Sequence, residues 1–229
     1  MNRRIAIRAA VLSMIAGSLL TGAASADPWS YEQNFNGGSS LTGWSHTQTE
    51  ISPSGTQTFL GQFDNDTVSL SLSNIPAHTQ LQVSFDLYVI GTWDGNDYPG
   101  PDRWSFGVQG EQPAIDTTFA VSKPTGYYQQ AWPMNYQETG SSFPHRYGAK
   151  ENNTLGYIWK GWAVDAIQEI NVTLEHSDAE VTLDFSAWGL QGIGDESWGI
   201  DNVVVTAVPA PGALAMFGLG GLVATRRRR

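Results

Sequence analysis

Apolar and polar residues alternate one by one along five stretches of the chain, and this alternation constrains the fold more than any other feature. It is clearest in residues 67–73 (TVSLSLS) and 81–89 (LQVSFDLYV), and it returns in residues 103–109, 170–176 and 181–185. Successive side chains of a β-strand point to opposite faces of a sheet, so each stretch predicts a strand with one buried face. Residues 200–208 are apolar almost throughout and predict a central strand that is covered on both faces.

Helical periodicity is nearly absent from the same region. Its best candidate, residues 162–170 (WAVDAIQEI), would form a turn or two at most. Loops rich in Gly, Pro, Asn and Asp separate the strands. We therefore predict an all-β fold, an antiparallel β-sandwich of the jelly-roll type, in one domain that spans residues 27–207. The chain has no cysteine, which excludes disulfides, thiolate metal sites and a cysteine nucleophile.

The first 26 residues have the three parts of a secretory signal peptide. Three arginines among the first eight residues precede an apolar run, residues 9–20, and Ala24 and Ala26 form an A-x-A cleavage site before Asp27. The pattern predicts that signal peptidase removes residues 1–26 and that the mature protein is exported.

The last 22 residues (VPAPGALAMFGLGGLVATRRRR, 208–229) combine two prolines, a short apolar run and four arginines. As a helix, residues 212–225 would measure about 21 Å, against a hydrocarbon core of about 30 Å. The arginines form a block that stays on the cytoplasmic side of a membrane. The proline-helix-arginine order predicts a C-terminal sorting signal.

This tail resembles the PEP-CTERM sorting domain that an exosortase recognises. The resemblance lies in Val208, Pro209, Ala210 and Pro211, in the Gly/Leu/Ala helix, and in Arg226, Arg227, Arg228 and Arg229, although the usual motif is Pro-Glu-Pro. It implies a single transmembrane sorting helix, held in the inner membrane until an exosortase-type enzyme cuts it. It also implies a final location at the cell surface or in the extracellular matrix.

Charge is distributed unevenly along the chain, whose net charge is −10. Only five of the 12 basic residues lie between residues 27 and 207, against all 22 acidic ones, which leaves that stretch at −17. Phosphate binding needs a basic surface, so nucleic acid is excluded as a partner. Divalent cations fit such a surface, and so does the simpler role of keeping an exported domain soluble.

The opening and closing strands of the domain resemble those of galactose-binding-like and carbohydrate-binding modules. The resemblance rests on residues 34–38 (NFNGG) with Gly43 and Trp44, and on residues 196–203 (ESWGIDNV). In such modules the first and last strands often hold a structural calcium ion. The resemblance implies Asp201 as a calcium ligand, together with Glu32 or an oxygen of residues 34–36.

Carboxylates also gather in a loop that follows the second alternating stretch. Asp94, Asn96 and Asp97, with Asp102 nearby, offer the hard oxygen ligands that calcium prefers, on a turn that contains a glycine. Residues 195–196 form a similar acidic pair. Asp, Asn and Gly are equally the usual residues of tight turns, so the loop is open to both interpretations.

Nine tryptophans and a long aromatic loop raise the question of a carbohydrate ligand. Residues 122–153 show no regular pattern, and a loop of this length is often functional. Aromatic rings stack on sugar faces, and large aromatic side chains also fill cores. We take Trp93, Tyr128, Trp132 and Tyr136 as candidate ligand-binding residues, the alternative being a loop that only covers the sandwich.

Catalytic signatures are missing from the sequence. The four histidines lack metal-binding spacing, and residues 195–199 (DESWG) depart from a nucleophile elbow. Asp86 and Asp184 are one candidate carboxylate pair for glycoside cleavage. The sequence favours a non-catalytic structural or adhesive protein of the cell surface or matrix, with calcium as a candidate cofactor and extracellular polysaccharide as a candidate partner. A carbohydrate-binding module and a glycoside-active enzyme are the two alternatives.

Overall fold

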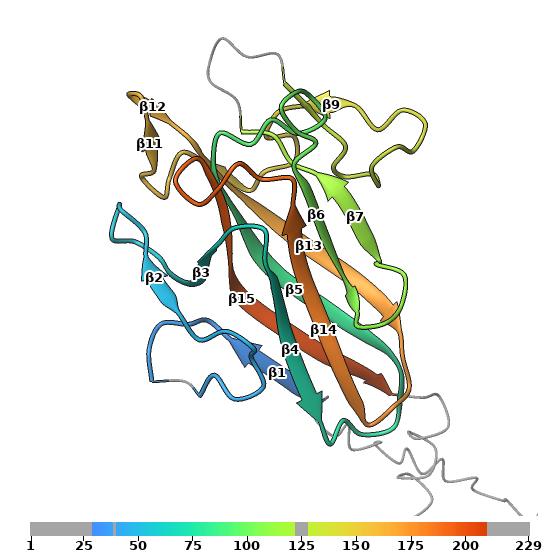
Figure 1. Ribbon diagram of the computed structural model, residues 1–229. Helices are drawn as coiled ribbons and strands as arrows, with labels where there is room; N and C mark the ends of the chain where they lie inside the picture. Colours follow the sequence, from blue (N-terminus) through green and yellow to red (C-terminus); the bar gives the residue numbers. More distant parts are fainter. Residues whose placement is uncertain (1–28, 39, 122–127, 210–229) are drawn as a thin grey trace, which may run out of the picture.

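The computed structural model describes residues 29–38, 40–121 and 128–209, and these fold into two antiparallel β-sheets packed face to face (Figure 1). The predicted signal peptide and most of the predicted sorting tail lie outside the described residues. Within the described part of the chain there is no α-helix, and so none that could cross a membrane. The predicted all-β, antiparallel fold is confirmed.

The larger sheet has seven strands in the order β10–β13–β5–β15–β3–β2, and β1 pairs with a separate part of β15. Its strands are β1 (Ser30–Gln33), β2 (Thr49–Ile51), β3 (Thr58–Phe63), β5 (His78–Gly91), β10 (Glu151–Asn152), β13 (Asp165–Glu175) and β15 (Glu196–Pro209).

The smaller sheet has four strands in the order β4–β14–β6–β7. They are β4 (Thr67–Ser73), β6 (Arg103–Val108), β7 (Ile115–Thr118) and β14 (Glu180–Trp188). Two short ribbons complete the described structure, β8 (Gln129–Gln130) with β9 (Phe143–Pro144), and β11 (Ile158–Trp159) with β12 (Trp162–Ala163).

The long strands alternate between the two sheets along the chain. β3, β5, β13 and β15 belong to the larger sheet, and β4, β6 and β14 lie between them in sequence and belong to the smaller one. This is the connectivity of a double-sheet jelly roll. Residues 162–170, the best helical candidate in the sequence, lie in β12 and β13 instead.

The core is built by the alternation that the sequence shows. In β4 the burial alternates residue by residue, with Val68, Leu70 and Leu72 facing inward. Phe85 of β5 lies at the centre of the interface, its ring centre 5.2 Å from those of both Phe106 and Phe185 on the opposite sheet. Burying each such side chain stabilises the fold by about 1.5–3 kcal/mol.

β15 is central, as predicted, but only part of it is covered on both faces. Every residue from 196 to 201 is buried, whereas burial alternates from residue 202 onward. The difference arises because a second apolar cluster covers the outer face of the larger sheet beside residues 196–201 only. Its members are Phe59, Tyr88, Ile90, Leu155 and Ile167.

β15 also runs two residues past the expected domain end at residue 207. Val208 lies opposite Gln80 and Pro209 lies opposite His78, so both belong to the sheet although the sequence pattern placed them in the tail. Proline has no amide hydrogen to donate, which makes Pro209 a suitable last residue of a strand.

One end of the sandwich, called here the loop pole, is formed by the end of β5, the start of β6, the end of β14 and the start of β15 (Figure 1). The loops at residues 92–102 and 189–195 lie at this end. At the opposite end, Ser30 of β1 pairs with Thr206 of β15.

Candidate metal and ligand sites at the loop pole

Three carboxylates meet inside the loop pole. Asp94 follows β5, Asp102 precedes β6, and Glu196 is the first residue of β15. One oxygen atom of each lies within 4.8 Å of one oxygen atom of the other two. Asp102 and Glu196 are 0% exposed, and Asp94 is buried as well. We call these three residues the acid cluster.

Two glycines allow the backbone segments that carry the acid cluster to approach each other. A Cβ atom on Gly91 would lie 1.9 Å from the carbonyl oxygen of Asp195, and one on Gly189 would lie 2.3 Å from that of Pro101. Both residues have a positive φ, +93° and +90° respectively, which glycine adopts without strain. The ends of β5 and β14 can therefore touch the loops that lead into Glu196 and Asp102.

Neutral groups satisfy the carboxylate oxygens of Asp102. One oxygen accepts hydrogen bonds from the backbone N–H groups of Asp94 and Gly95, the second at 3.2 Å. The other accepts one from Nε2 of Gln191 at 3.4 Å. Asp94 is in turn hydrogen-bonded by the side chain of Tyr128.

Glu196 is less well satisfied. Its Oε2 accepts a hydrogen bond from the backbone N–H of Gln191 at 2.9 Å. Its Oε1 is fully buried and has no hydrogen-bond partner among the described residues. Leaving a buried charged oxygen unpaired is costly, so this atom indicates a missing ligand or a bound proton.

Burial and mutual repulsion both disfavour the charged form of these groups. Burial is the main cause that raises the pKa of Asp102 to about 7, and the charge of Asp94 raises it further. Burial likewise raises the pKa of Glu196 to about 8, followed by the charge of Asp102. Both effects favour a bound proton or a bound cation at the acid cluster near neutral pH.

Raised carboxyl pKa values are also a mark of acid–base catalysis. A sugar ring would have to reach the carboxyl groups for that chemistry. Asp102 and Glu196 are completely buried, so the acid cluster is better suited to hold a small ion than to act on a glycoside.

Asn96 and Asp97, predicted as calcium ligands beside Asp94, use their oxygens to hold neighbouring loops. Oδ1 of Asn96 accepts a hydrogen bond from the hydroxyl of Thr118, and Oδ2 of Asp97 accepts one from the backbone N–H of Gln129 at 2.8 Å. The structure instead brings Glu196 to Asp94 and Asp102.

Asp201 lies away from the acid cluster, five residues farther along β15 and about 16 Å at a rise of ~3.3 Å per residue. Its Oδ2 accepts a hydrogen bond from the hydroxyl of Tyr88 at 3.0 Å, and its Oδ1 accepts one from the backbone N–H of Asn202 at 2.7 Å. Burial raises the pKa of Asp201 to about 6. The groove that contains Glu32 and Asn34 is lined by Asn202 rather than by Asp201.

The four aromatic residues predicted to bind a ligand lie in different environments. Trp93 is 0% exposed, and its indole N–H donates to the backbone oxygens of residues 90 and 197, so its ring is not available to a ligand. Trp132 is half-buried and packs against Phe119 at 5.6 Å between ring centres. Tyr128 contacts the acid cluster, as described above. Only Tyr136 belongs to a surface array of aromatic and charged side chains.

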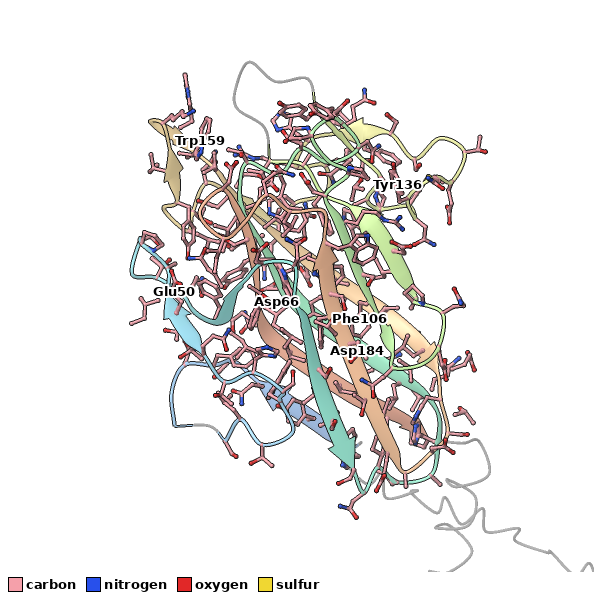
Figure 2. All side chains as sticks on the ribbon, in the orientation of Figure 1. Glu50, Asp66, Phe106, Tyr136, Trp159 and Asp184 are labelled. Atoms are coloured by element: carbon pink, nitrogen blue, oxygen red, sulfur yellow. The ribbon has the colours of Figure 1, made fainter. Side chains whose placement is uncertain are left out.

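That array, called here the aromatic platform, consists of Trp188, Arg103, Tyr136 and Asp116. Arg103 lies opposite Trp188 in the pairing of β6 with β14. The guanidinium carbon of Arg103 is 4.7 Å from the ring centre of Tyr136 and 5.0 Å from that of Trp188. Asp116 of β7 forms an ion pair with the same guanidinium. Trp188 is 39% exposed, and Figure 2 shows Tyr136 at the same end of the smaller sheet.

Trp188 is a candidate binding residue that the sequence analysis missed. Residues 181, 183 and 185 face the core, and continuing this alternation places residue 188 on the outer face with residues 182, 184 and 186. A tryptophan in the polar phase of a strand is the signal that could have revealed it.

The rest of this outer face is polar and hydrogen-bonded. The hydroxyl of Ser69 donates to Asp184 at 2.7 Å, and Gln109 donates to the same carboxylate at 3.3 Å. Two hydroxyl pairs, Ser71 with Thr182 and Thr67 with Ser186, extend the pattern along β4 and β14. Figure 2 shows Asp184 on this face of the smaller sheet.

Asp86 and Asp184, the candidate pair for glycoside cleavage, do not face each other. Asp86 lies on β5 of the larger sheet and forms an ion pair with Lys150, whereas Asp184 lies on β14 of the smaller sheet. Both occupy the polar phase of their strands, so the core of the sandwich separates them. The proposed pair is wrong for this geometric reason.

No protein-family model matches the chain, and no curated protein matches its sequence. Among solved structures, it is similar to a family GH115 4-O-methyl-α-glucuronidase with specificity for decorated arabinogalactans, at 14% identity and a TM-score of 0.39. That match covers 90% of this chain but only 20% of the glucuronidase.

Two further similar structures are carbohydrate-binding modules. One is the C-terminal family 6 module of a marine laminarinase from Zobellia galactanivorans, with 11% identity, a TM-score of 0.36, and coverage of 77% of this chain and 98% of that one. The other, from a Cellvibrio mixtus lichenase, was solved with cellotriose and has 14% identity, a TM-score of 0.33, and coverage of 78% and 97%. These values are too low to assign the chain to a family.

Proposed function

We propose that the protein is an exported, non-catalytic β-sandwich that binds polysaccharide through the aromatic platform. The observation that carries the proposal is the exposed indole of Trp188 beside the Arg103–Asp116 ion pair. An indole offers an apolar face to the C–H groups of a sugar ring. A guanidinium and a carboxylate offer donors and acceptors to its hydroxyl groups.

The shape of the surface favours an extended chain over a single sugar. The platform lies at the edge of a sheet face and continues into the polar side chains of β4 and β14. Two shallow grooves lie elsewhere, on the outer face of the larger sheet. A ligand that lies along a sheet face contacts several sugar units at once, and each contact can be weak.

A structural or adhesive role at the cell surface or in the extracellular matrix fits the same activity, since a protein that binds matrix polysaccharide is retained there. Export through the signal peptide, membrane anchoring through the tail and processing by an exosortase-type enzyme are parts of this proposal that rest on the sequence of residues 1–26 and 208–229.

The experiment is a glycan array probed with the purified full-length protein, followed by affinity electrophoresis in the polysaccharides that bind. Trp188→Ala should reduce retardation in the gel at least tenfold. Trp162→Ala is the matched control, because Trp162 is 47% exposed on β12, outside the platform. If the wild-type protein binds no glycan, or if both variants bind equally well, the proposal fails.

A further inference from the structure

The acid cluster places three carboxylates in one buried position without a basic side chain to balance Asp102 or Glu196. The partners of these two residues are backbone N–H groups and the amide of Gln191. The two ion pairs found among the described residues, Arg103 with Asp116 and Lys150 with Asp86, use other carboxylates. Like charges held this close in a buried site repel each other strongly.

The orphaned oxygen of Glu196 is a second and independent observation. Oε1 is buried and unpartnered although the side chain is anchored through Oε2 to the backbone N–H of Gln191. The side chain is thus held in place with one oxygen left without a partner. A buried carboxylate oxygen without a hydrogen-bond partner can serve as a metal ligand.

We propose that Asp94, Asp102 and Glu196 bind one divalent cation, and that this cation is calcium. All three ligands are carboxylate oxygens, which suit hard cations and not those that prefer nitrogen or sulfur. Calcium–oxygen distances of about 2.3–2.6 Å place opposite ligands about 4.6–5.2 Å apart. The three oxygens lie within 4.8 Å of one another, which is within the span of one calcium coordination sphere.

Local structure supports calcium over magnesium. Magnesium demands near-ideal octahedral geometry and usually keeps several waters, whereas calcium accepts irregular sets of six to eight oxygens. The acid cluster is buried and assembled from two segments, the loop of residues 92–102 and the start of β15. An ion at this point joins segments about a hundred residues apart in sequence, and so it stabilises the loop pole directly. This inference concerns the folded domain itself and does not depend on glycan binding.

The experiment measures thermal unfolding of the full-length protein after treatment with a chelator, with and without added CaCl₂. A calcium concentration about a hundredfold above Kd should raise the unfolding midpoint by about 5–10 °C, because only the folded state holds the ion. Magnesium at the same concentration should give a clearly smaller shift.

Glu196→Gln keeps the size and the hydrogen bond of the side chain and removes one charge. We expect it to lose the calcium shift, because a neutral amide oxygen replaces one of the three carboxylate ligands. Glu111→Gln makes the same change at an exposed position and should keep the shift in full. Asp102→Asn repeats the test in case Glu196→Gln does not fold.

Terbium provides a second readout, since it occupies calcium sites and emits when a neighbouring aromatic ring is excited. Tyr128 contacts Asp94 directly, so bound terbium should luminesce and calcium should displace it. The proposal is overturned if calcium leaves the wild-type midpoint unchanged at millimolar concentration. It is equally overturned if Glu196→Gln and Asp102→Asn both retain the wild-type shift, which would place any calcium elsewhere.

Discussion

Gly91 offers a direct test of how the loop pole is assembled. It ends β5 with a φ of +93°, and a Cβ atom there would lie 1.9 Å from the carbonyl oxygen of Asp195. Real Cβ atoms do not come closer than 3.0 Å, so in Gly91→Ala the two backbone segments must separate by about 1.1 Å. The change therefore moves the segment that leads into Glu196.

Gly110→Ala is the matched control. Gly110 has a φ of +85°, almost the same as that of Gly91, but a Cβ atom there would meet nothing within 4 Å. Both substitutions incur the cost of placing alanine at positive φ, about 1–2 kcal/mol. Gly91→Ala additionally disturbs two backbone hydrogen bonds, from Gly91 to Val164 at 2.8 Å and from Thr92 to Asp195 at 2.9 Å. At about 1–3 kcal/mol for each hydrogen bond lost, we expect about 2–6 kcal/mol of extra destabilisation.

The assay is urea unfolding followed by tryptophan fluorescence, with thermal melting as a second measurement. In a domain of this size each kcal/mol lowers the midpoint by about 2–4 °C, so Gly91→Ala should melt at least about 4 °C below Gly110→Ala. If the free energies of unfolding of the two variants agree within about 1 kcal/mol, an added Cβ at residue 91 is tolerated. That result would contradict the close approach of Gly91 to Asp195 and, with it, the close packing of the acid cluster.

Three further predictions concern buried polar groups. Burial raises the pKa of Asp201 from 3.8 to about 6, so the folded protein holds this proton more tightly than the unfolded chain and stability falls as pH rises from about 4 to 6. Asp201→Asn, measured in chelator, should be equal to wild type near pH 4 and more stable by about 1–2 kcal/mol at pH 7; equal stability at both pH values would contradict this. Asp165→Ala removes the acceptor of three backbone N–H groups in residues 155–157 and should cost about 2–4 kcal/mol in urea unfolding, with faster hydrogen exchange at those amides. Unchanged exchange there would refute the assignment. Trp198→Phe removes the indole N–H that donates to the backbone oxygen of Asp64 at 2.8 Å and should lower stability by about 2–3 kcal/mol, a prediction that a loss below 1 kcal/mol would contradict.

The strands were predictable because a strand that is buried on one face alternates between apolar and polar residues. Residues 67–73 coincide with β4, two other stretches fall within β5 and β14, and the last two extend one residue past the ends of β6 and β13. The same signal fails where both faces are covered. Residues 162–170 form β12 and part of β13, and their apolar positions do not alternate because residues 165–168 are buried on both sides.

The acid cluster was only partly accessible to sequence reasoning. Asp94 was identified with its loop neighbours, because acidic turn residues are visible locally. Glu196 joins it only through the pairing of β15 with β5, which places Glu196 opposite Gly91 across a hundred residues of chain. Contacts of this range depend on strand order and register, and a single sequence does not contain them.

Trp93 was predicted to bind a ligand, but it is a core residue. It stands between a threonine and an aspartate in a glycine-containing segment that reads as an exposed turn. In the structure its indole fills the core and donates to two backbone oxygens at 3.1 and 3.0 Å. The two carbonyl groups belong to neighbouring residues of β5 and β15, which the local composition around Trp93 does not reveal.

The pairing of β1 with the C-terminal half of β15 determines how the domain would be oriented if it were attached to a surface through either terminus. Ser30 and Pro209 leave the sandwich at the end opposite the loop pole (Figure 1). β15 covers 14 residues between them and Glu196, about 40–45 Å at a rise of ~3.3 Å per residue. An attachment ahead of Ser30 or after Pro209 would hold the domain at the end opposite the loop pole. Trp188 and the acid cluster would then lie at the end farthest from the attachment. Immobilising the protein through either terminus should therefore leave the loop pole equally accessible to a large polymer.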